Sequence, residues 1–310
     1  MRFLVVGAGA IGGYFGGRLL EAGRDVTFLV RSGRAAQLAT TGLVIRSRLG
    51  DVVLPSPPRV LAPELSSHFD VVLLSCKAYD LEPAMASFAP AVGPDTAILP
   101  LLNGLSHLDR LSDRFGGDRV LGGQCFISAS LDPGGVVLHL NESHTLSFGE
   151  RVGARSARVR AIAAAMAGAR FDARASDEIL QEMWEKWVFI AAAAAITCLM
   201  RAPVGDIVAA GGADLAVALL DECGAVAKAA GCAPRSDLVE RNRALLTAAG
   251  SGLAASMLRD VERSAPTEVD HIIGDMLRRR GDAPEPDHSL LRIAYTHLKA
   301  YEARRVREGN

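Results

Sequence analysis

Hydrophobic and polar positions follow two different periods along the chain and divide it into two parts. In the first part, short apolar runs of strand length alternate with stretches of helical period. Strands are predicted at residues 3–6, 26–30, 69–75 and 97–102, and later at 120–130, 136–141 and 145–148. Helices are predicted at residues 11–22, 81–92 and 154–167. Strands that alternate with helices of this length predict a parallel sheet covered by helices on both faces.

After about residue 171 the pattern is helical, and no strand-like stretch competes with it. The predicted helices cover residues 178–200, 214–230, 236–249, 253–264, 268–280 and 287–305. The sequence therefore predicts an α/β domain with a doubly wound sheet over residues 1–172. An all-helical domain over residues 173–310 follows, and we expect a cleft between the two.

Composition excludes several classes of protein. The 34 basic and 35 acidic residues leave a net charge of −1, which offers no footprint for nucleic acid or an anionic membrane. The basic run Arg278-Arg279-Arg280 is interpreted as the last turn of a helix rather than a binding patch. The longest apolar run, residues 187–200, is shorter than the roughly 17–25 residues of a membrane span. It is predicted to be a buried helix.

The first residues of the chain indicate the cellular compartment, and the compartment indicates the redox state of the cysteines. The apolar run at residues 3–6 is too short for the core of a signal peptide, which favours a cytoplasmic protein. The five cysteines are therefore expected as reduced thiols. They show no CxxC and no Cys/His ligand spacing, so no metal site is expected.

A glycine-rich loop follows the first predicted strand and opens the first predicted helix. Its residues, which match GxGxxG, are Gly7, Ala8, Gly9, Ala10, Ile11 and Gly12. Gly7 permits a tight turn, Gly9 lets a pyrophosphate approach the backbone, and Gly12 lets helix and strand pack closely. The helix N-terminus then stabilises the negative charge. The alternative is a glycine-rich turn without a ligand, but this context favours dinucleotide binding on a Rossmann-type domain.

The end of the second strand indicates which dinucleotide is bound. An NAD site usually has Asp or Glu there, to bind the ribose 2′-hydroxyl. Here residues 26–30 are followed by Arg31-Ser32-Gly33-Arg34, with no acid. A guanidinium suits a 2′-phosphate, so Arg31 favours NADP(H); the alternative is a solvated loop arginine.

With these residues the chain resembles the ketopantoate reductase family (2-dehydropantoate 2-reductases), nearly from end to end. The resemblance rests on an ordered series of motifs: Gly7–Gly13, Val30-Arg31, Cys76-Lys77-Ala78-Tyr79, Leu102-Asn103-Gly104, Trp184-Glu185-Lys186, Ser256–Asp260 and Thr267–Asp270. It implies a Rossmann domain joined to a helical domain like the C-terminal domain of 6-phosphogluconate dehydrogenase, with the active site between them.

The resemblance also implies roles for individual residues. Lys77, Asn103 and, by a looser match, Ala129 are expected at the cofactor. Lys186 is expected as the general acid for the keto oxygen, with Asn103 beside the reacting carbonyl. Ser256 is expected at the substrate carboxylate. Glu268 is expected to contact both cofactor and substrate, whereas a structural role is favoured for the neighbouring His271.

The sequence departs from the family on the helix that carries Lys186. Ketopantoate-specific members have asparagines four and eight residues after the lysine, which hold the substrate's terminal hydroxyl, and a third substrate asparagine eighteen residues after it. Here these positions are Ile190, Ala194 and Val204. An apolar wall replaces polar contacts, so we expect a 2-keto acid with a more apolar tail than ketopantoate.

The sequence thus predicts an NADPH-dependent reductase that converts a 2-keto acid to a 2-hydroxy acid, either 2-dehydropantoate 2-reductase or a close variant. Two alternatives stay open: a non-catalytic NADP(H)-binding sensor, and a related β-hydroxyacid or opine-type dehydrogenase. Neither a nucleic acid nor a membrane is expected as a partner. The long alanine-rich helices are candidates for pairing in a homodimer.

Overall fold

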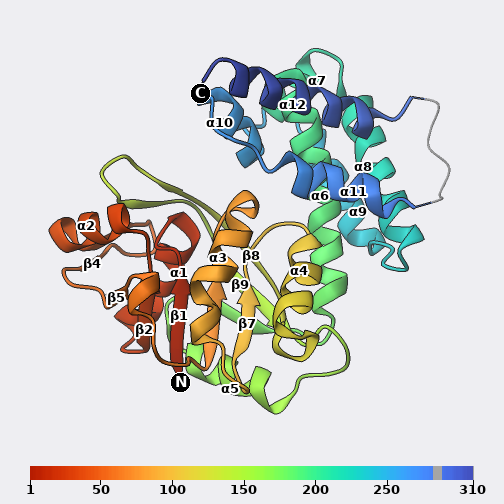
Figure 1. Ribbon diagram of the computed structural model, residues 1–310. Coiled ribbons are helices and arrows are strands. Elements are labelled where there is room, and N and C mark those ends of the chain that lie inside the picture. The colour runs from red at the N-terminus through yellow and green to blue at the C-terminus, as the bar shows by residue number, and fades with distance from the viewer. Residues whose placement is uncertain (282–287, 310) are drawn as a thin grey trace. The chain divides into compact units, whose positions relative to one another are not determined.

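The computed structural model describes residues 1–281 and 288–309. The chain divides into two compact units (Figure 1). An α/β unit contains Met1–Asn103 and His107–Leu180, and a helical unit contains Gly104–Ser106 and the chain from Gln181 on. The change of unit falls at the start of the long helix α6 (Ile179–Met200), after the predicted boundary at residue 172. Asp287, where the last predicted helix begins, lies outside the described residues.

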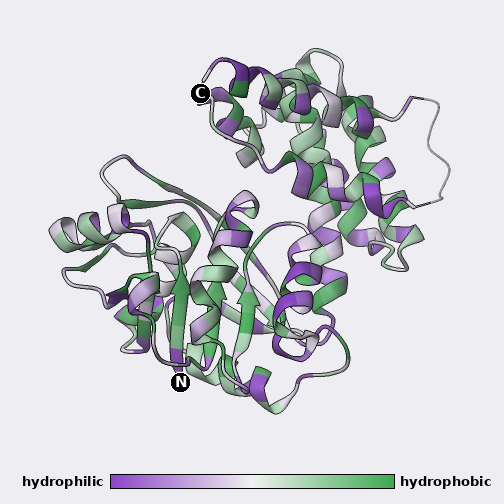
Figure 2. Ribbon diagram, viewed as in Figure 1, coloured by the Kyte–Doolittle hydropathy of each residue, from purple (hydrophilic) through white to green (hydrophobic). Residues whose placement is uncertain are grey.

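The central sheet of the α/β unit is parallel, as predicted. Its strands are β1 (Arg2–Val6), β2 (Asp25–Leu29), β5 (Arg59–Val60), β6 (Val71–Leu74) and β7 (Ala97–Pro100). They follow the order β5-β2-β1-β6-β7, so β1 lies between β2 and β6. Strand β6 and residues Phe3–Val6 of β1 are apolar and buried (Figure 2), since both faces of the sheet are covered here. The loops after β2 and β6 consequently flank the loop after β1.

A second sheet, which the sequence analysis did not predict as such, belongs to the same unit. It contains β3 (Leu43–Arg46), β4 (Val52–Leu54), β8 (Gly122–Leu131), β9 (Val137–Gly149) and β10 (Asp172–Ala175). The strands predicted at 136–141 and 145–148 are one continuous strand, β9. The prediction that no strand follows residue 171 is wrong, because β10 pairs with β9. Its residues have little β-propensity, so pairing with the neighbouring strand determines their structure.

Helix α1 (Ala10–Glu21) lies between the two sheets, and its glycines explain how. A Cβ on Gly16 would lie 2.6 Å from the ring of Phe28 on the central sheet. Cβ atoms on Gly13 and Gly17 would lie 2.9 Å from Val137 and 2.7 Å from Ile45 of the second sheet. Each of these distances is shorter than a normal carbon–carbon contact. The helix therefore fits between the sheets only because these positions carry no side chain.

Three further helices of the α/β unit cover its sheets or connect their strands. They are α2 (Ser32–Thr41), α3 (Leu81–Phe88) and α5 (Ala157–Met166). The predicted helix 81–92 ends earlier, in a 3₁₀ turn at Ala89–Ala91. Helix α4 (Ser106–Phe115) begins at the end of the segment Gly104–Ser106, which belongs to the helical unit.

The helical unit is built around α6. The other helices are α7 (Val204–Ala209), α8 (Ala213–Ala229), α9 (Ser236–Leu246), α10 (Ser256–Glu262), α11 (Asp275–Arg279) and α12 (Leu290–Arg307). Of these, α7 was not predicted. Helix α6 is long and apolar enough to cross a membrane, but 72% of its most apolar window is buried. This burial is typical of a core helix, as predicted for residues 187–200.

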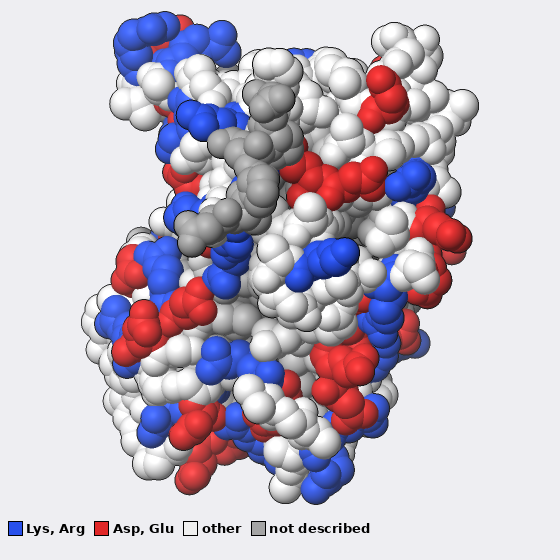
Figure 3. Space-filling view, turned by 90° about the vertical axis from the view of Figure 1, so that its right-hand side faces the viewer, with Lys and Arg blue, Asp and Glu red and all other residues white. Residues whose placement is uncertain are grey.

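One predicted helix, residues 268–280, contains an irregularity. A π-helical turn, η5 (Asp270–Gly274), precedes α11. The basic run that follows ends the helix, as predicted: Arg278 and Arg279 pair with Asp275, and Arg280 pairs with Glu222. Figure 3 shows positive and negative side chains interspersed over most of one face of the molecule, as the near balance of charge predicts.

The packing of α1 makes a prediction about stability. Gly16→Ala should lower the free energy of unfolding by about 1–3 kcal/mol, because the methyl group would overlap Phe28. The matched control is Gly224→Ala in the middle of α8, where a Cβ meets nothing within 4 Å. There alanine should stabilise the helix by about 0.5–1 kcal/mol. Thermal unfolding of both variants measures the difference, and a Gly16→Ala protein as stable as the control would contradict this packing.

Candidate functional site

The glycine loop turns sharply between β1 and α1. Gly7 has a φ of +93°, and its N–H donates a hydrogen bond of 2.9 Å to the carbonyl of Leu29 at the end of β2. A Cβ on Gly12 would overlap the carbonyl oxygen of Gly7 and the hydroxyl of Ser75. The first turn of α1 therefore packs directly against the loop and the end of β6. These contacts are the ones that the motif predicts for Gly7 and Gly12.

Gly9 differs from these glycines because the space beside it is open. It is the N-cap residue of α1, with an extended backbone and no side-chain cap. A Cβ built on Gly9 would meet no atom within 4 Å. The first turn of α1, which includes Ala10 and Ile11, contains no acidic residue. An uncapped helix start with open space before it fits a phosphate group, so the loop suits the pyrophosphate of a dinucleotide.

Arg34 supports the loop from α2, a role that the sequence analysis did not assign. Its Nε donates a hydrogen bond of 2.9 Å to the carbonyl of Ala8, and Nη1 donates one of 3.1 Å to Gly135. The side chain of Gln37 accepts a further bond from it. Burial lowers the pKa of the Arg34 guanidinium. Since Ala8 and Gly135 are distant in sequence, no local pattern indicated these contacts.

Arg31 lies at the N-cap of α2, at the end of the second strand as predicted. Its Nη2 donates a hydrogen bond of 2.7 Å to Oδ1 of Asp80, a residue of the turn that follows β6. This contact with Asp80 raises the pKa of the Arg31 guanidinium. The arginine side chain is 75% exposed. An acidic side chain from a different loop therefore lies beside Arg31, at the end of β2.

Lys77 and Asn103 follow β6 and β7, and both are half-buried. Because β1, β2, β6 and β7 are parallel, their carboxyl ends meet at one edge of the sheet. The structure therefore brings Lys77 and Asn103 to the edge that carries the glycine loop and Arg31. Ala129 lies on β8 of the second sheet, opposite His139 and directly after a shift in the register between β8 and β9.

In the helical unit, Lys186 is half-buried on α6. Ile190 and Ala194 follow at intervals of four residues and lie on the same helical face. Ile190 is half-buried, whereas Ala194 is only 3% exposed. Val204 is fully buried at the start of α7, and its N–H bonds to the carbonyl of Leu253. All three replacements of the family asparagines are thus held in an apolar, largely covered part of the unit.

The residue before Lys186 on α6 has a buried carboxylate. Glu185 is buried and accepts hydrogen bonds from Arg235, whose Nε lies 2.7 Å from Oε1, and from Gln181 at 3.1 Å. Burial raises the pKa of the Glu185 carboxyl, but the bonds from Arg235 and Gln181 outweigh burial and lower it. The carboxylate is therefore ionised, and its charge is compensated by Arg235.

The segment that begins with Glu268 is joined to α6 by a buried hydrogen bond. The indole Nε1 of Trp187 donates to the carbonyl of Ile272 at 3.0 Å. The carbonyl of Glu268 accepts bonds from His271 and Ile272 as the π-helical turn begins. Glu268 is half-buried. The structure thus brings the segments of Lys186 and Glu268 together within the helical unit, on adjoining elements.

His271 has a structural contact, as the sequence analysis favoured. Its Nδ1 and the hydroxyl of Ser106 are 2.7 Å apart. Gly104 has a φ of +77°, and a Cβ there would lie 3.1 Å from both the ring and the carbonyl of His271. His271 therefore packs against the turn that directly follows Asn103, in the segment that belongs to the helical unit.

Ser256 begins α10 and is exposed. The residue before it, Ala255, donates its N–H to the hydroxyl of Thr197 at 3.4 Å. Thr197 lies eleven residues after Lys186, which is about three helical turns. Ser256 is therefore held near the far end of the helical face that starts with Lys186.

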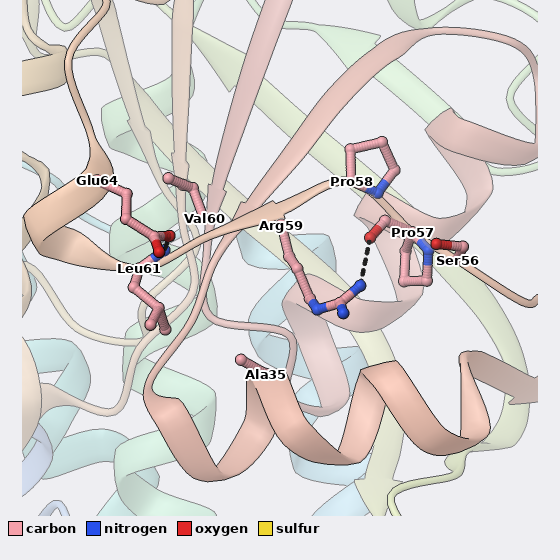
Figure 4. Close-up of a pocket in the computed structure, with 8 residues that line it drawn as sticks. All are labelled: Ala35, Ser56, Pro57, Pro58, Arg59, Val60, Leu61 and Glu64. Carbon is pink, nitrogen blue, oxygen red and sulfur yellow. Dashed lines mark hydrogen bonds between the residues drawn. The ribbon is translucent and has the colours of Figure 1, made fainter.

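One pocket of the α/β unit contains none of the predicted site residues. It has a volume of about 420 Å³ beside β5 (Figure 4). Its lining consists of Ala35, Ser56, Pro57, Pro58, Arg59, Val60, Leu61 and Glu64. Arg59 bonds to the carbonyl of Pro57, and Glu64 accepts the N–H of Leu61. The charged side chains of this pocket, Arg59 and Glu64, are thus engaged with its own backbone.

Comparisons with known proteins define the class of the chain. The family described as "Ketopantoate reductase PanE/ApbA" matches residues 3–153, and its C-terminal domain family matches residues 178–302. These matches cover most of the chain, so it belongs to the ketopantoate reductase family. The fold class and the family resemblance that the sequence indicated are both confirmed.

Individual relatives agree with this assignment. The chain is 40% identical over 306 residues to the uncharacterized oxidoreductase YkpB of Bacillus subtilis, covering 98% of this chain and 99% of that protein. It is 29% identical to a 2-dehydropantoate 2-reductase of Mesorhizobium japonicum, with coverage of 92% and 94%. The crystal structure of 2-dehydropantoate 2-reductase from Methylococcus capsulatus superposes with a TM-score of 0.87 at 30% identity, covering 98% of each chain. The chain is an oxidoreductase of this family.

The open space beside Gly9 makes a prediction about binding. Gly9→Ala should leave the thermal unfolding midpoint unchanged, since its backbone suits alanine and its Cβ meets no neighbour. The methyl group would fill the space before the helix, so the dissociation constants of NADPH and NADH should rise at least about tenfold, roughly 1.4 kcal/mol. Fluorescence titration of the reduced cofactors measures this, with Gly224→Ala as control. Unchanged binding by Gly9→Ala would mean that no pyrophosphate lies there.

Proposed function

We propose that this protein is a cytoplasmic, NADPH-dependent reductase that converts a 2-keto acid to the corresponding 2-hydroxy acid. The observation that carries the proposal is the arrangement of α6, where a half-buried Lys186 begins an apolar helical face next to the segment of Glu268. The fit of the glycine loop to a pyrophosphate and the guanidinium of Arg31 support the cofactor.

Different residues of the chain have separate roles in such a reaction. The amides at the start of α1 bind the pyrophosphate, while Arg31 contacts the 2′-phosphate. Lys77, Asn103 and Ala129 are proposed at the cofactor, and Asn103 also at the substrate. The bound nicotinamide supplies the hydride. These residues contribute positioning, which lowers the entropic part of the barrier.

In the helical unit, Lys186 holds a proton on Nζ and donates it to the keto oxygen as that oxygen gains charge. The Ser256 hydroxyl donates a hydrogen bond to the substrate carboxylate. Glu268 orders the groups around it and contacts cofactor and substrate. The turn at η5 and its bond from Trp187 hold this carboxylate's segment against α6.

The side chains after Lys186 indicate the substrate's tail. Ile190 and Ala194 offer no hydrogen-bonding group, and burial of a hydroxyl without a partner costs about 1–3 kcal/mol. We therefore propose a 2-keto acid with a tail more apolar than that of ketopantoate.

A homodimer is also proposed. A ketopantoate reductase from Staphylococcus aureus, 21% identical with a TM-score of 0.80, is described as dimeric. That likeness concerns the fold, and the pairing of this chain remains a prediction.

Lys186→Ala tests the reaction. Turnover, followed as NADPH oxidation across a panel of 2-keto acids that includes ketopantoate, should fall about 10²–10⁴-fold, because the proton donor is lost. NADPH binding should be retained. The matched control is Lys228→Ala, which removes an exposed lysine in the last turn of α8 and should leave turnover unchanged. Full activity of Lys186→Ala would contradict the proposed role, and NADPH binding by the wild type without turnover on any acid would favour the sensor.

Ile190→Asn tests the substrate's tail. The wild-type kcat/KM should be higher for an apolar 2-keto acid than for ketopantoate, and Ile190→Asn should shift the ratio toward ketopantoate by about tenfold, since the amide pairs with the hydroxyl. Ile293→Asn, the same change at an exposed position of α12, is the control. A wild type that prefers ketopantoate by tenfold or more over every apolar acid would show that this inference is wrong.

A further inference from the structure

The Arg31–Asp80 pair lies where two loops of the α/β unit meet. Arg31 follows β2, and Asp80 ends the 3₁₀ turn η2 (Ala78–Asp80) that follows β6. Since β2 and β6 flank β1, both loops border the glycine loop. The 2.7 Å bond between the two side chains therefore joins the loops at the carboxyl edge of the sheet, beside the start of α1.

The pair places a negative charge at the guanidinium proposed for the 2′-phosphate. A phosphate bound to Arg31 would lie near the Asp80 carboxylate, which already accepts a hydrogen bond from the same Nη2. The phosphate and the Asp80 carboxylate are both negative and repel each other when they lie beside one guanidinium. Arg31 must then be shared between the two anions, or its bond to Asp80 must break. The pair is exposed, so it is weak enough to open, and Arg31 can still bind a phosphate.

The 2′-hydroxyl of NADH is favoured by the same carboxylate that repels a 2′-phosphate. A carboxylate accepts a hydrogen bond from a ribose hydroxyl, which is the contact that an acid at the end of the second strand makes in NAD proteins. In this chain the acid comes from the loop after β6 instead. The neighbouring Arg34 bonds through Nε and Nη1 to the carbonyls of Ala8 and Gly135, and its Nη2 has no hydrogen-bond partner among the described residues. The guanidinium that pairs with Asp80 is that of Arg31.

We propose that Asp80 is a residue that determines cofactor specificity by lowering the affinity for a 2′-phosphate. The chain then binds NADPH through Arg31 with only a small margin over NADH and accepts both. This inference rests on the proposed function only in taking the cofactor to be a nicotinamide dinucleotide. It does not depend on which keto acid is reduced.

Asp80→Asn tests the proposal in the full chain, by fluorescence titration of NADPH and NADH without any keto acid. The wild-type preference for NADPH should be less than about tenfold, and in Asp80→Asn it should rise about fivefold to tenfold. The gain should come from tighter NADPH binding, with NADH binding unchanged or weaker. At high ionic strength the difference should shrink, because exposed charges are screened.

Glu82→Gln is the matched control. Glu82 lies two residues after Asp80, carries the same charge and pairs with Arg110 instead of Arg31. Its neutralisation should change the NADPH/NADH ratio by less than about twofold. In an Arg31→Ala background, Asp80→Asn should have a smaller effect on the ratio than in the wild type, since part of its effect acts through the guanidinium.

An Asp80→Asn ratio within about twofold of the wild type would overturn the proposal, as would an equal effect of Glu82→Gln. A chain that binds neither cofactor would overturn it together with the proposed function. Intact binding and the expected shift in ratio, without turnover on any keto acid, would support the role of Asp80 while the reductase proposal fails.

Discussion

The close packing of α1 between two sheets is the constraint on which the α/β unit depends. Gly16 lies against Phe28 of the central sheet, and Gly13 and Gly17 lie against Val137 and Ile45 of the second sheet. At these glycines the backbone of α1 lies directly against the sheets, while Tyr14 and Phe15 of the same helix are fully buried, and such dense packing leaves little room for rotation. The same helix presents its N-terminus to the loop at Gly9. The sequence Gly12-Gly13 and Gly16-Gly17 therefore serves packing and binding at once.

The parts of the fold that the sequence predicts are those determined by local patterns. The parallel sheet follows from apolar runs such as Val71–Leu74, and α6 follows from its length and composition. The second sheet could not be predicted in the same way, because β10 is a strand only through its pairing with β9. The predicted strands at residues 136–141 and 145–148 are one strand, and β8 pairs with it at residues 137–139 and 144–149, on either side of a shift in register.

The same distinction between local patterns and long-range contacts applies to the candidate site. The four-residue spacing of Lys186, Ile190 and Ala194 predicts a common helical face, and GxGxxG predicts the loop, since both are local. Asp80 could not be assigned to Arg31, because 49 residues separate them and only the parallel order of β2, β1 and β6 joins their loops. The contact of Ser106 with His271 spans 165 residues. An absent acid at the end of a strand is therefore weak evidence about a cofactor until the neighbouring loops are known.

The π-helical turn at η5 supplies a hydrogen-bond acceptor to Trp187, the residue after the proposed proton donor. A π-helical turn interrupts the usual i to i−4 bonding, and such turns are frequent at functional sites because they alter the direction of side chains. In this turn the carbonyl of Ile272 accepts a buried bond from the Trp187 indole. This bond satisfies a polar group in the core and holds Glu268's segment to α6 one residue beyond Lys186. The irregular turn and the tryptophan are therefore joined by one buried bond, which links the segment that begins with Glu268 to the helix that carries Lys186.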